Sequence, residues 1–323
     1  MKRTLVGVSV LALAAALLTA APLAVATAPG CNGHLTFMRQ DSAGFWQVWV
    51  ANADLTDQRK LTHGAADSGW PVWSPDGKKL AFETDRGDAN PGGEITVNDV
   101  FTMNADGSGV KNLTGSATFS GDPGWSPDGS LIAFSSNGGD YPAKQGIYVM
   151  RPDGSDVRRV TILPAGDAGD GAPRFSPDGR HLVFTRYRGD VANSALFIVD
   201  LDGHHLRQVT PFAIGAGDAD WSPDGKELVF ESSPTPQSHG QTDVVRTDGR
   251  KLRTLKSDFS ADPVWSPDGK QIILLQGEEI DGRMTFGLAT MKPNGTKRHF
   301  ISATPMDEHQ PDMASLSTGH HCR

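Results

Sequence analysis

Short apolar runs recur along the chain and alternate with stretches rich in glycine, proline and polar residues. Five of these runs contain three or four consecutive apolar residues: 80–82, 131–134, 182–184, 228–230 and 272–275. Short apolar runs bounded by turn residues are typical of buried β-strands. Further strand-like runs end shortly before an Asp-Gly pair, which favours a tight hairpin because it tolerates positive φ: 100–103, 147–150 and 196–199. The pattern predicts an all-β chain of short antiparallel strands.

The tetrapeptide Ser-Pro-Asp-Gly stands shortly before each of the first five runs and defines a repeat. Its copies are separated by 52, 50, 46 and 44 residues, and they begin at Ser74, Ser126, Ser176, Ser222 and Ser266. An aromatic residue precedes every copy: Trp73, Trp125, Phe175, Trp221 and Trp265. A four-stranded propeller blade takes about 40–50 residues, so each copy predicts one blade.

We interpret the tetrapeptides as structural turns and not as a chemical site. Proline presets φ, aspartate caps the turn backbone, and glycine adopts positive φ. The preceding aromatic residue is expected to pack between blades. The residues given this role are Asp76, Gly77, Asp128, Gly129, Asp178, Gly179, Asp224, Gly225, Asp268 and Gly269.

The two ends of the repeat region complement one another. Leu35-Thr36-Phe37 matches the strand that follows a tetrapeptide, whereas residues 310–313 match only the strand that precedes one. Pairing the last strand with the first three would complete a sixth blade and leave no sheet edge exposed at the seam. The prediction is a six-bladed β-propeller over residues 27–323, with repeats at about 33–313, closed jointly by the N- and C-terminal segments.

Only two cysteines are present, Cys31 and Cys322, near the two ends of this region. In an exported protein such a pair suggests one disulfide, which here would lock the closing blade. The alternative is a lipidated Cys31, although Ala28-Pro29-Gly30 lacks the aliphatic residue that usually stands three positions before such a cysteine. We expect the disulfide.

The repeated aromatic-Ser-Pro-Asp-Gly motif resembles the WD40-like repeat with a Pro-Asp core (PD40) that builds the propellers of TolB and of related periplasmic and peptidase-associated proteins. The resemblance covers residues 33–313. It implies an extracytoplasmic propeller, yet the chain has no evident counterpart of the separate domain that precedes the propeller in TolB or of the hydrolase domain of prolyl oligopeptidases.

The N-terminus predicts export. Lys2 and Arg3 precede an apolar stretch and then small residues, as in a secretory signal peptide over residues 1–26; the alternative, an uncleaved anchor, is disfavoured because Pro22 interrupts a short apolar run. Removing this segment leaves 28 basic against 38 acidic side chains, a formal charge of −10. A chain this acidic is not expected to bind nucleic acid. We expect a secreted or cell-envelope protein that is not an integral membrane protein, and a monomer, although the residues do not fix the oligomeric state.

The sequence offers no catalytic motif, metal motif or cofactor motif. His-Glu-x-x-His, Gly-x-Ser-x-Gly and phosphate-binding loop patterns are absent, and the ten histidines are scattered. We therefore predict no catalytic residues, no metal and no cofactor.

The candidate site lies where long loops enter the innermost strand of each blade, next to the central channel. Loops on a rigid scaffold commonly carry binding residues, and these end in a predicted ring at the channel mouth: Asp67, Trp70, Asp122, Asp170, Asp218, Asp262, Asp307 and His309. A ring of carboxylates could attract a cation or a basic peptide, whereas any single aspartate could simply cap a strand or stay hydrated.

The function expected from these residues is a non-catalytic scaffold that binds a protein or peptide through the long-loop face or the channel. Two alternatives stay open: a carbohydrate-active lyase or hydrolase with a site at the channel mouth, and a carrier of a small molecule or metal. Propellers support unrelated activities, so the fold alone does not choose between them.

Overall fold

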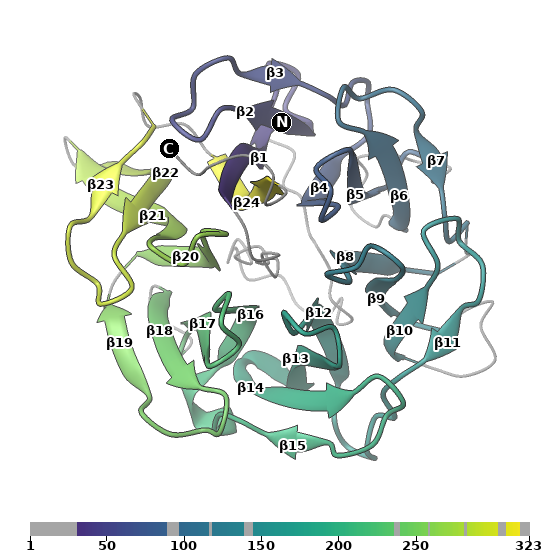
Figure 1. The fold of residues 1–323 in the computed structure, drawn as a ribbon, viewed down its shortest axis with the longest axis vertical. Coiled ribbons are helices and arrows are strands. Elements are labelled where there is room, and N and C mark those ends of the chain that lie inside the picture. Colours follow the sequence, from purple (N-terminus) through teal and green to yellow (C-terminus); the bar gives the residue numbers. More distant parts are fainter. Residues whose placement is uncertain are drawn as a thin grey trace.

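In the computed structural model of the 323-residue chain, the described residues are 31–88, 97–115, 118–138, 145–235, 240–257, 259–280, 283–302 and 308–316. They form six four-stranded antiparallel sheets arranged around a central axis (Figure 1). The only helical segment among them is one short 3-10 turn, η1 (Phe212–Ile214). None of the described helical structure has the length and apolar character needed to cross a membrane. The chain is thus the all-β, six-bladed propeller that the repeat predicts.

Each of the first five blades uses four consecutive strands, the first innermost and the fourth outermost. Blade 1 contains β4 (Ser68–Trp73), β5 (Lys79–Thr84), β6 (Asp99–Asn104) and β7 (Lys111–Asn112). Blade 2 contains β8 (Ser120–Trp125), β9 (Ile132–Ser136), β10 (Gly146–Met150) and β11 (Arg158–Arg159). Blade 3 contains β12 (Gly169–Phe175), β13 (His181–Arg188), β14 (Asp190–Asp200) and β15 (Arg207–Gln208).

The second half of the ring continues in the same way. Blade 4 contains β16 (Ala216–Trp221), β17 (Glu227–Ser232), β18 (Gln241–Arg246) and β19 (Arg253–Lys256). Blade 5 contains β20 (Ser260–Trp265), β21 (Ile272–Ile280), β22 (Arg283–Met291) and β23 (His299–Phe300).

Blade 6 joins the two ends of the chain. Its innermost strand is β24 (Glu308–Leu316), which pairs with β1 (Cys31–Gln40), followed by β2 (Trp46–Ala51) and β3 (Arg59–Lys60). Met313 lies opposite Leu35 in the register of β24 and β1. The predicted closure by head and tail is therefore confirmed at the level of strand pairing.

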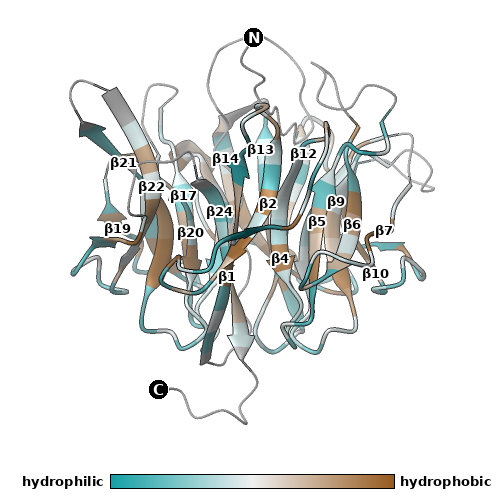
Figure 2. Cartoon of the chain, turned by 90° about the horizontal axis from the view of Figure 1, so that it is seen from above, coloured by the Kyte–Doolittle hydropathy of each residue, from teal (hydrophilic) through white to brown (hydrophobic). Residues whose placement is uncertain are grey.

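The hydrophobic core is divided among the seams between consecutive blades. Successive side chains of a strand point to opposite faces, so each blade contributes to two seams. Six of the buried apolar clusters each combine residues of two neighbouring blades; for example, Val72 and Val100 of blade 1 pack with Phe134 and Tyr148 of blade 2. Figure 2 shows the strands standing side by side along the axis with their apolar parts at mid-height.

The connections fall on two faces. The Ser-Pro-Asp-Gly turns and the later hairpin turns lie on one face, which we call the short-turn face, and the remaining loops lie on the opposite, long-loop face. In the tetrapeptides the aspartate Oδ1 accepts the backbone N–H two residues later, as Asp76 does from Lys78 at 3.1 Å. The tetrapeptide glycines adopt φ between +67° and +71°. The short-turn face is built from almost identical turns.

Candidate functional site

The innermost strand of every blade contains one residue with positive φ at an equivalent position. These six residues have φ between +49° and +56°, and the strand register shifts beside each of them: Trp70, Asp122, Ala172, Asp218, Asp262 and Gln310. Such a β-bulge takes its residue out of the ladder and turns its side chain. The six positions lie on the innermost strands, which surround the central axis in Figure 1. We call them the bulge ring.

Each N–H group of the bulge ring is accepted by a side chain from the preceding blade. In three cases the acceptor belongs to the preceding bulge residue. Gln310 Oε1 accepts from Trp70 at 2.7 Å, and Asp122 Oδ2 accepts from Ala172 at 3.2 Å. Asp262 Oδ2 accepts from Gln310 at 3.4 Å.

In the other three cases the acceptor comes from the second strand of the preceding blade. Glu83 Oε2 accepts from Asp122 at 3.0 Å, and Thr185 Oγ1 accepts from Asp218 at 3.2 Å. The Glu231 carboxyl group accepts the N–H of Asp262. A buried backbone donor without a partner is costly, so this closed circuit gives several channel carboxyl groups a structural function.

Burial and mutual repulsion alter the ionisation of these acids. Burial, followed by the nearby Asp122 carboxylate, raises the pKa of Asp218 well above its usual range. Burial, with Glu231 and Asp218 beside it, does the same for Asp262. Burial and the neighbouring Asp122 raise the pKa of Glu83 as well. The bulge ring therefore favours protonated carboxyl groups in the free protein.

Some carboxyl oxygens near the bulge ring accept no hydrogen bond from the backbone. Among the described residues, Asp218 Oδ1, Glu231 Oε2 and Asp262 Oδ1 are buried and have no hydrogen-bond partner. Asp218 is not needed as an acceptor, because Glu231 of the same blade already accepts the next bulge N–H. Asp218 and Glu231 belong to blade 4, and Asp262 belongs to blade 5. The three unused oxygens are therefore on two neighbouring blades.

A fully buried arginine also lies on the innermost strand of blade 3. Arg174 follows the bulge of blade 3 by two residues, is fully buried, and donates from Nη1 to the carbonyl of Pro173 at 2.7 Å. Its Nε and Nη2 have no partner among the described residues. Gly124 of blade 2 lets the backbone of blade 3 approach, since a Cβ there would lie 2.8 Å from the carbonyl oxygen of Pro173. The charges of Asp122, Asp220, Asp218 and Asp312 oppose the lowering of the Arg174 pKa that burial causes.

Trp70 crosses the channel mouth. Its side chain is 8% exposed and packs against Ala172, which belongs to blade 3 and not to the adjacent blade 2. The small Ala172 side chain at the equivalent bulge position leaves the space that the indole fills. Trp70 therefore links blade 1 to blade 3 across the bulge ring.

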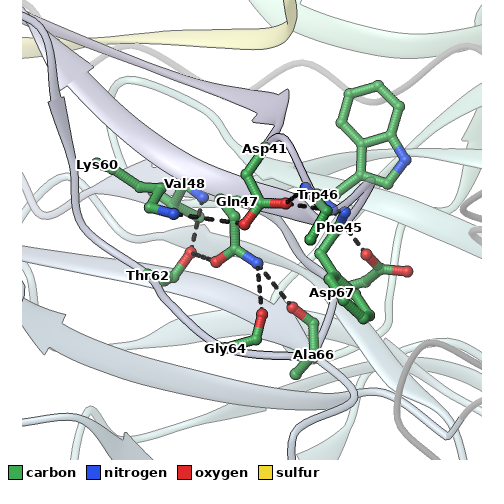
Figure 3. A network of polar contacts seen from close by, with 11 residues as sticks. Asp41, Phe45, Trp46, Gln47, Val48, Lys60, Thr62, Gly64, Ala66 and Asp67 are labelled. Atoms are coloured by element: carbon green, nitrogen blue, oxygen red, sulfur yellow. Dashed lines mark hydrogen bonds and ion pairs between the residues drawn. The ribbon is translucent and has the colours of Figure 1, made fainter.

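The remaining predicted site residues lie elsewhere. Asp67 Oδ1 accepts the N–H of Trp46 at 2.7 Å, and the Asp67 N–H donates to Asp85 at 2.8 Å, so Asp67 holds the segment that enters blade 1 against blade 6 (Figure 3). Gln47 fixes the same segment by donating to the carbonyls of Gly64 and Ala66.

Asp170 and His309 also lie away from the bulge ring. Asp170 forms a buried bidentate pair with Arg186, at 2.6 and 2.8 Å, because its strand position directs it toward β13 and not toward the axis. His309 meets the edge of Trp46, with ring centroids 5.1 Å apart. The predicted acidic ring thus combined residues at two different strand positions, and the side chains at these positions point in different directions.

Three further predictions concern residues outside the described part of the chain. Asp307 and Cys322 lie beyond it, as does the side chain of Cys31. The predicted signal peptide, residues 1–26, also falls outside the described residues. The disulfide and the signal peptide stay predictions.

Sequence reasoning missed the second-strand contributors, Glu83 and Glu231, and the buried Arg174. Glu83 and Glu231 immediately follow the apolar runs Leu80-Ala81-Phe82 and Leu228-Val229-Phe230. A charged residue directly after a buried run was a readable signal. Among the described residues, no three His, Cys, Asp or Glu side chains form a group that could hold a metal ion.

Comparisons with known proteins agree with this architecture. Residues 165–316 match the family model described as the TolB β-propeller domain, PD40. A TolB homologue from Chlorobium luteolum is 34% identical over 170 residues, which cover 53% of this chain and 35% of that protein. The matched segment is therefore little more than a third of that relative's length.

Solved structures give the same fold. The chain resembles TolB from Acinetobacter baumannii with a TM-score of 0.69 at 19% identity, covering 88% of this chain and 67% of that one. It resembles a TolB candidate from Agrobacterium tumefaciens with a TM-score of 0.61 at 20% identity, covering 88% and 92% of the two chains. The repeat, the six blades and the match of residues 165–316, a little under half of the chain, together support a TolB-like six-bladed β-propeller.

Proposed function

We propose that this propeller is an extracytoplasmic, non-catalytic scaffold that binds a protein or peptide partner at the long-loop mouth of its channel. The likeness to TolB proteins supports a binding role at a general level. The proposal includes export through the signal peptide of residues 1–26 and a disulfide between Cys31 and Cys322, both of which rest on the sequence pattern.

The observation that carries the proposal is the surplus of buried acceptors on blades 4 and 5. Asp218 Oδ1, Glu231 Oε2 and Asp262 Oδ1 have no donor among the described residues, although buried polar groups are usually paired. A lysine or arginine side chain from a partner would supply both donors and positive charge. The nearest buried cation of this chain, Arg174, engages backbone carbonyls with Nη1 instead of these oxygens.

Binding of such a cation would be coupled to proton release. The pKa values of Asp218 and Asp262 are raised, so the free protein favours their protonated forms. To pair with a partner's positive charge, these carboxyl groups must lose their protons. The partner is thus expected to bind more tightly as the pH rises.

The test is affinity capture from the cell envelope or culture fluid of the source organism, with the mature protein as bait. A double variant, Asp218→Asn with Asp262→Asn, keeps the side-chain shapes but removes the capacity to ionise. The matched control is Asp202→Asn with Asp248→Asn, in exposed hairpin turns.

Recovery of the same specific partner by the wild type and the control, but not by the channel variant, would support the proposal. Equal recovery by all three proteins, each with an unchanged unfolding midpoint, would exclude the channel mouth as the binding site.

A further inference from the structure

The seam between blades 4 and 5 differs from the other seams. In blades 1, 2, 3 and 6, the second and third strands place two aromatic residues opposite each other on the face toward the preceding blade: Phe82 and Phe101, Phe134 and Tyr148, Phe184 and Phe197, and Phe37 and Trp49. Blade 5 has Leu274 and Ala289 at these positions. Blade 4 keeps one aromatic residue, Phe230 opposite Asp243, whereas blade 5 has none at these two positions.

The end of this seam on the long-loop face is also left without a cover. In blades 6 and 3 an arginine two residues further along the second strand lies over the aromatic pair, as Arg186 does at 5.4 Å from Phe184 and 5.1 Å from Phe197. In blade 5 the equivalent residue is Gln276. A cleft of about 290 Å³ opens at this place, and Gln276, Phe259 and Phe300 line it. Its volume corresponds to the lower end of ordinary small-ligand pockets.

Two cationic side chains line the cleft. Arg298 donates from Nη1 to Gln276 Oε1 at 3.0 Å, and Gln276 donates to the carbonyl of Phe259 at 3.1 Å. Gln276 is buried, so it fixes the guanidinium with a neutral acceptor. No described acid forms a salt bridge with Arg298. Lys256, at the end of β19, lines the cleft as the second cation. A guanidinium held in this way can bind a carboxylate through its remaining N–H groups.

Two acidic residues are also part of the lining. Glu278 and Glu279 follow Gln276 on β21 and are exposed. The cleft therefore presents positive charge, two phenyl rings and negative charge within a space about the size of one residue. The equivalents of Arg298 in blades 1 to 4 are the apolar Val110, Val157, Leu206 and Leu252. Blade 6 has the same pair with its residues exchanged, since Arg39 on the second strand donates to Gln58 Oε1 at 3.0 Å, so a guanidinium donated from the outermost strand is particular to blade 5.

We propose that this cleft is a binding site for a small zwitterion with an apolar body, that is, a free aromatic amino acid. Arg298 receives the α-carboxylate, Phe259 and Phe300 contact the side chain, and Glu278, on the same face of β21 as Gln276, receives the ammonium group. The site is separate from the channel mouth and does not depend on the function proposed for it.

The experiment is a titration of the purified mature protein with three probes, followed by calorimetry and by ligand-observed NMR. L-phenylalanine carries all three features, N-acetyl-L-phenylalanine lacks the ammonium group, and phenethylamine lacks the carboxylate. We expect saturable binding of L-phenylalanine and at least about tenfold weaker binding of each truncated probe, because a charge-assisted hydrogen bond contributes about 1.5–3 kcal/mol.

Two substitutions locate the site. Arg298→Gln removes the positive charge and is expected to weaken L-phenylalanine at least about tenfold, whereas Arg250→Gln, on an exposed hairpin turn of blade 4, is expected to change nothing. Glu278→Gln with Glu279→Gln should weaken the binding of L-phenylalanine but not that of the acetylated probe. The Asp218→Asn and Asp262→Asn pair at the channel should leave the titration unchanged.

The absence of saturable binding to the folded wild type, or binding that Arg298→Gln does not weaken, would overturn the site. Equal affinity for L-phenylalanine and its acetylated form would overturn the zwitterion as its ligand. Unfolding midpoints of every variant within about 2 °C of the wild type would show that a loss of binding is not a loss of fold.

Discussion

Hydrogen bonds join neighbouring blades both at the channel, through the bulge ring, and at the rim, which the outermost strands form. Side chains accept these bonds at the channel and donate them at the rim. At the channel, side-chain oxygens accept the bulge N–H of the next blade, as Asp122 does from Ala172. At the rim, basic side chains of the outermost strands donate to backbone carbonyls in the hairpin turn of the next blade, as Arg158 does to Leu201 and Arg207 to Thr247.

The rim and the channel differ in solvent exposure and in the polar atoms that they leave without a hydrogen-bond partner. The rim contacts are exposed, and their charges stay in contact with solvent. The channel acids are buried, their pKa values are raised, and three of their oxygens have no partner among the described residues. The rim repeats the same contact, whereas the channel and the blade 4–5 seam depart from the repeat, and both proposed binding sites rest on these departures.

The sharpest contrast between the channel and the rim is expected at Asp122. Asp122→Ala removes the acceptor used by both the Ala172 N–H and the Ser135 hydroxyl, and it places alanine at φ +54°. We expect a loss of about 3 kcal/mol in the free energy of unfolding, measured by urea denaturation. Asp153→Ala, on an exposed turn, should cost less than about 1 kcal/mol. Similar losses for the two variants would contradict a structural role for the bulge ring.

A second comparison concerns the glycine of a rim turn. Gly203 has φ +84°, and a Cβ there would lie 2.7 Å from the carbonyl oxygen of Val160 in the preceding blade. Gly166 has φ +92° with no atom within 4 Å of an added Cβ. Gly203→Ala should therefore destabilise by about 2 kcal/mol and Gly166→Ala by about 1 kcal/mol. The difference between their unfolding midpoints measures the close blade-to-blade approach, and equal midpoints would refute it.

The pH dependence of stability gives a third comparison. Burial raises the pKa of Asp312 to about 7, while its Oδ2 accepts the N–H of Trp73. The folded state thus holds a proton that the unfolded state releases above its ordinary value of 3.8. The stabilisation is complete below pH 3.8 and is lost as the pH rises toward 7.

Asp312→Asn removes this titration and keeps an oxygen that can accept from Trp73. Relative to the wild type, the variant should gain stability as the pH rises from about 3.8 to 8, by about 1 kcal/mol or more in total, in urea unfolding at both pH values. The pKa of the turn aspartate Asp128 shifts the opposite way, because the Ser126 hydroxyl and the Ser130 N–H lower it. Parallel pH profiles for the two proteins would show that Asp312 does not titrate in this range.

The smallest effect is expected at the rim. Arg158→Ala or Arg207→Ala removes one exposed hydrogen bond to the next blade and should cost about 0.5 kcal/mol. A loss above about 2 kcal/mol for either substitution would mean that the rim, and not the channel, is the main lock between blades.

The sequence predicted the short-turn face far better than the channel, for a physical reason. Every tetrapeptide performs the same local task, so its residues and their roles can be read from one copy. The bulge acceptors are nonlocal: Asp122 depends on Glu83 in one blade and serves Ala172 in another. Asp67 and Asp122 look alike in the sequence, yet strand alternation and the bulge send one toward blade 6 and the other into the channel.

The proposed role of the channel is tested most directly by the dissociation constant of the captured partner, measured by calorimetry between pH 6 and pH 8.5. We expect at least about tenfold tighter binding at the higher pH, with proton release that disappears in the Asp218→Asn, Asp262→Asn variant. A dissociation constant that changes neither with pH nor with this substitution would contradict the placement of the partner's positive charge among the channel acids.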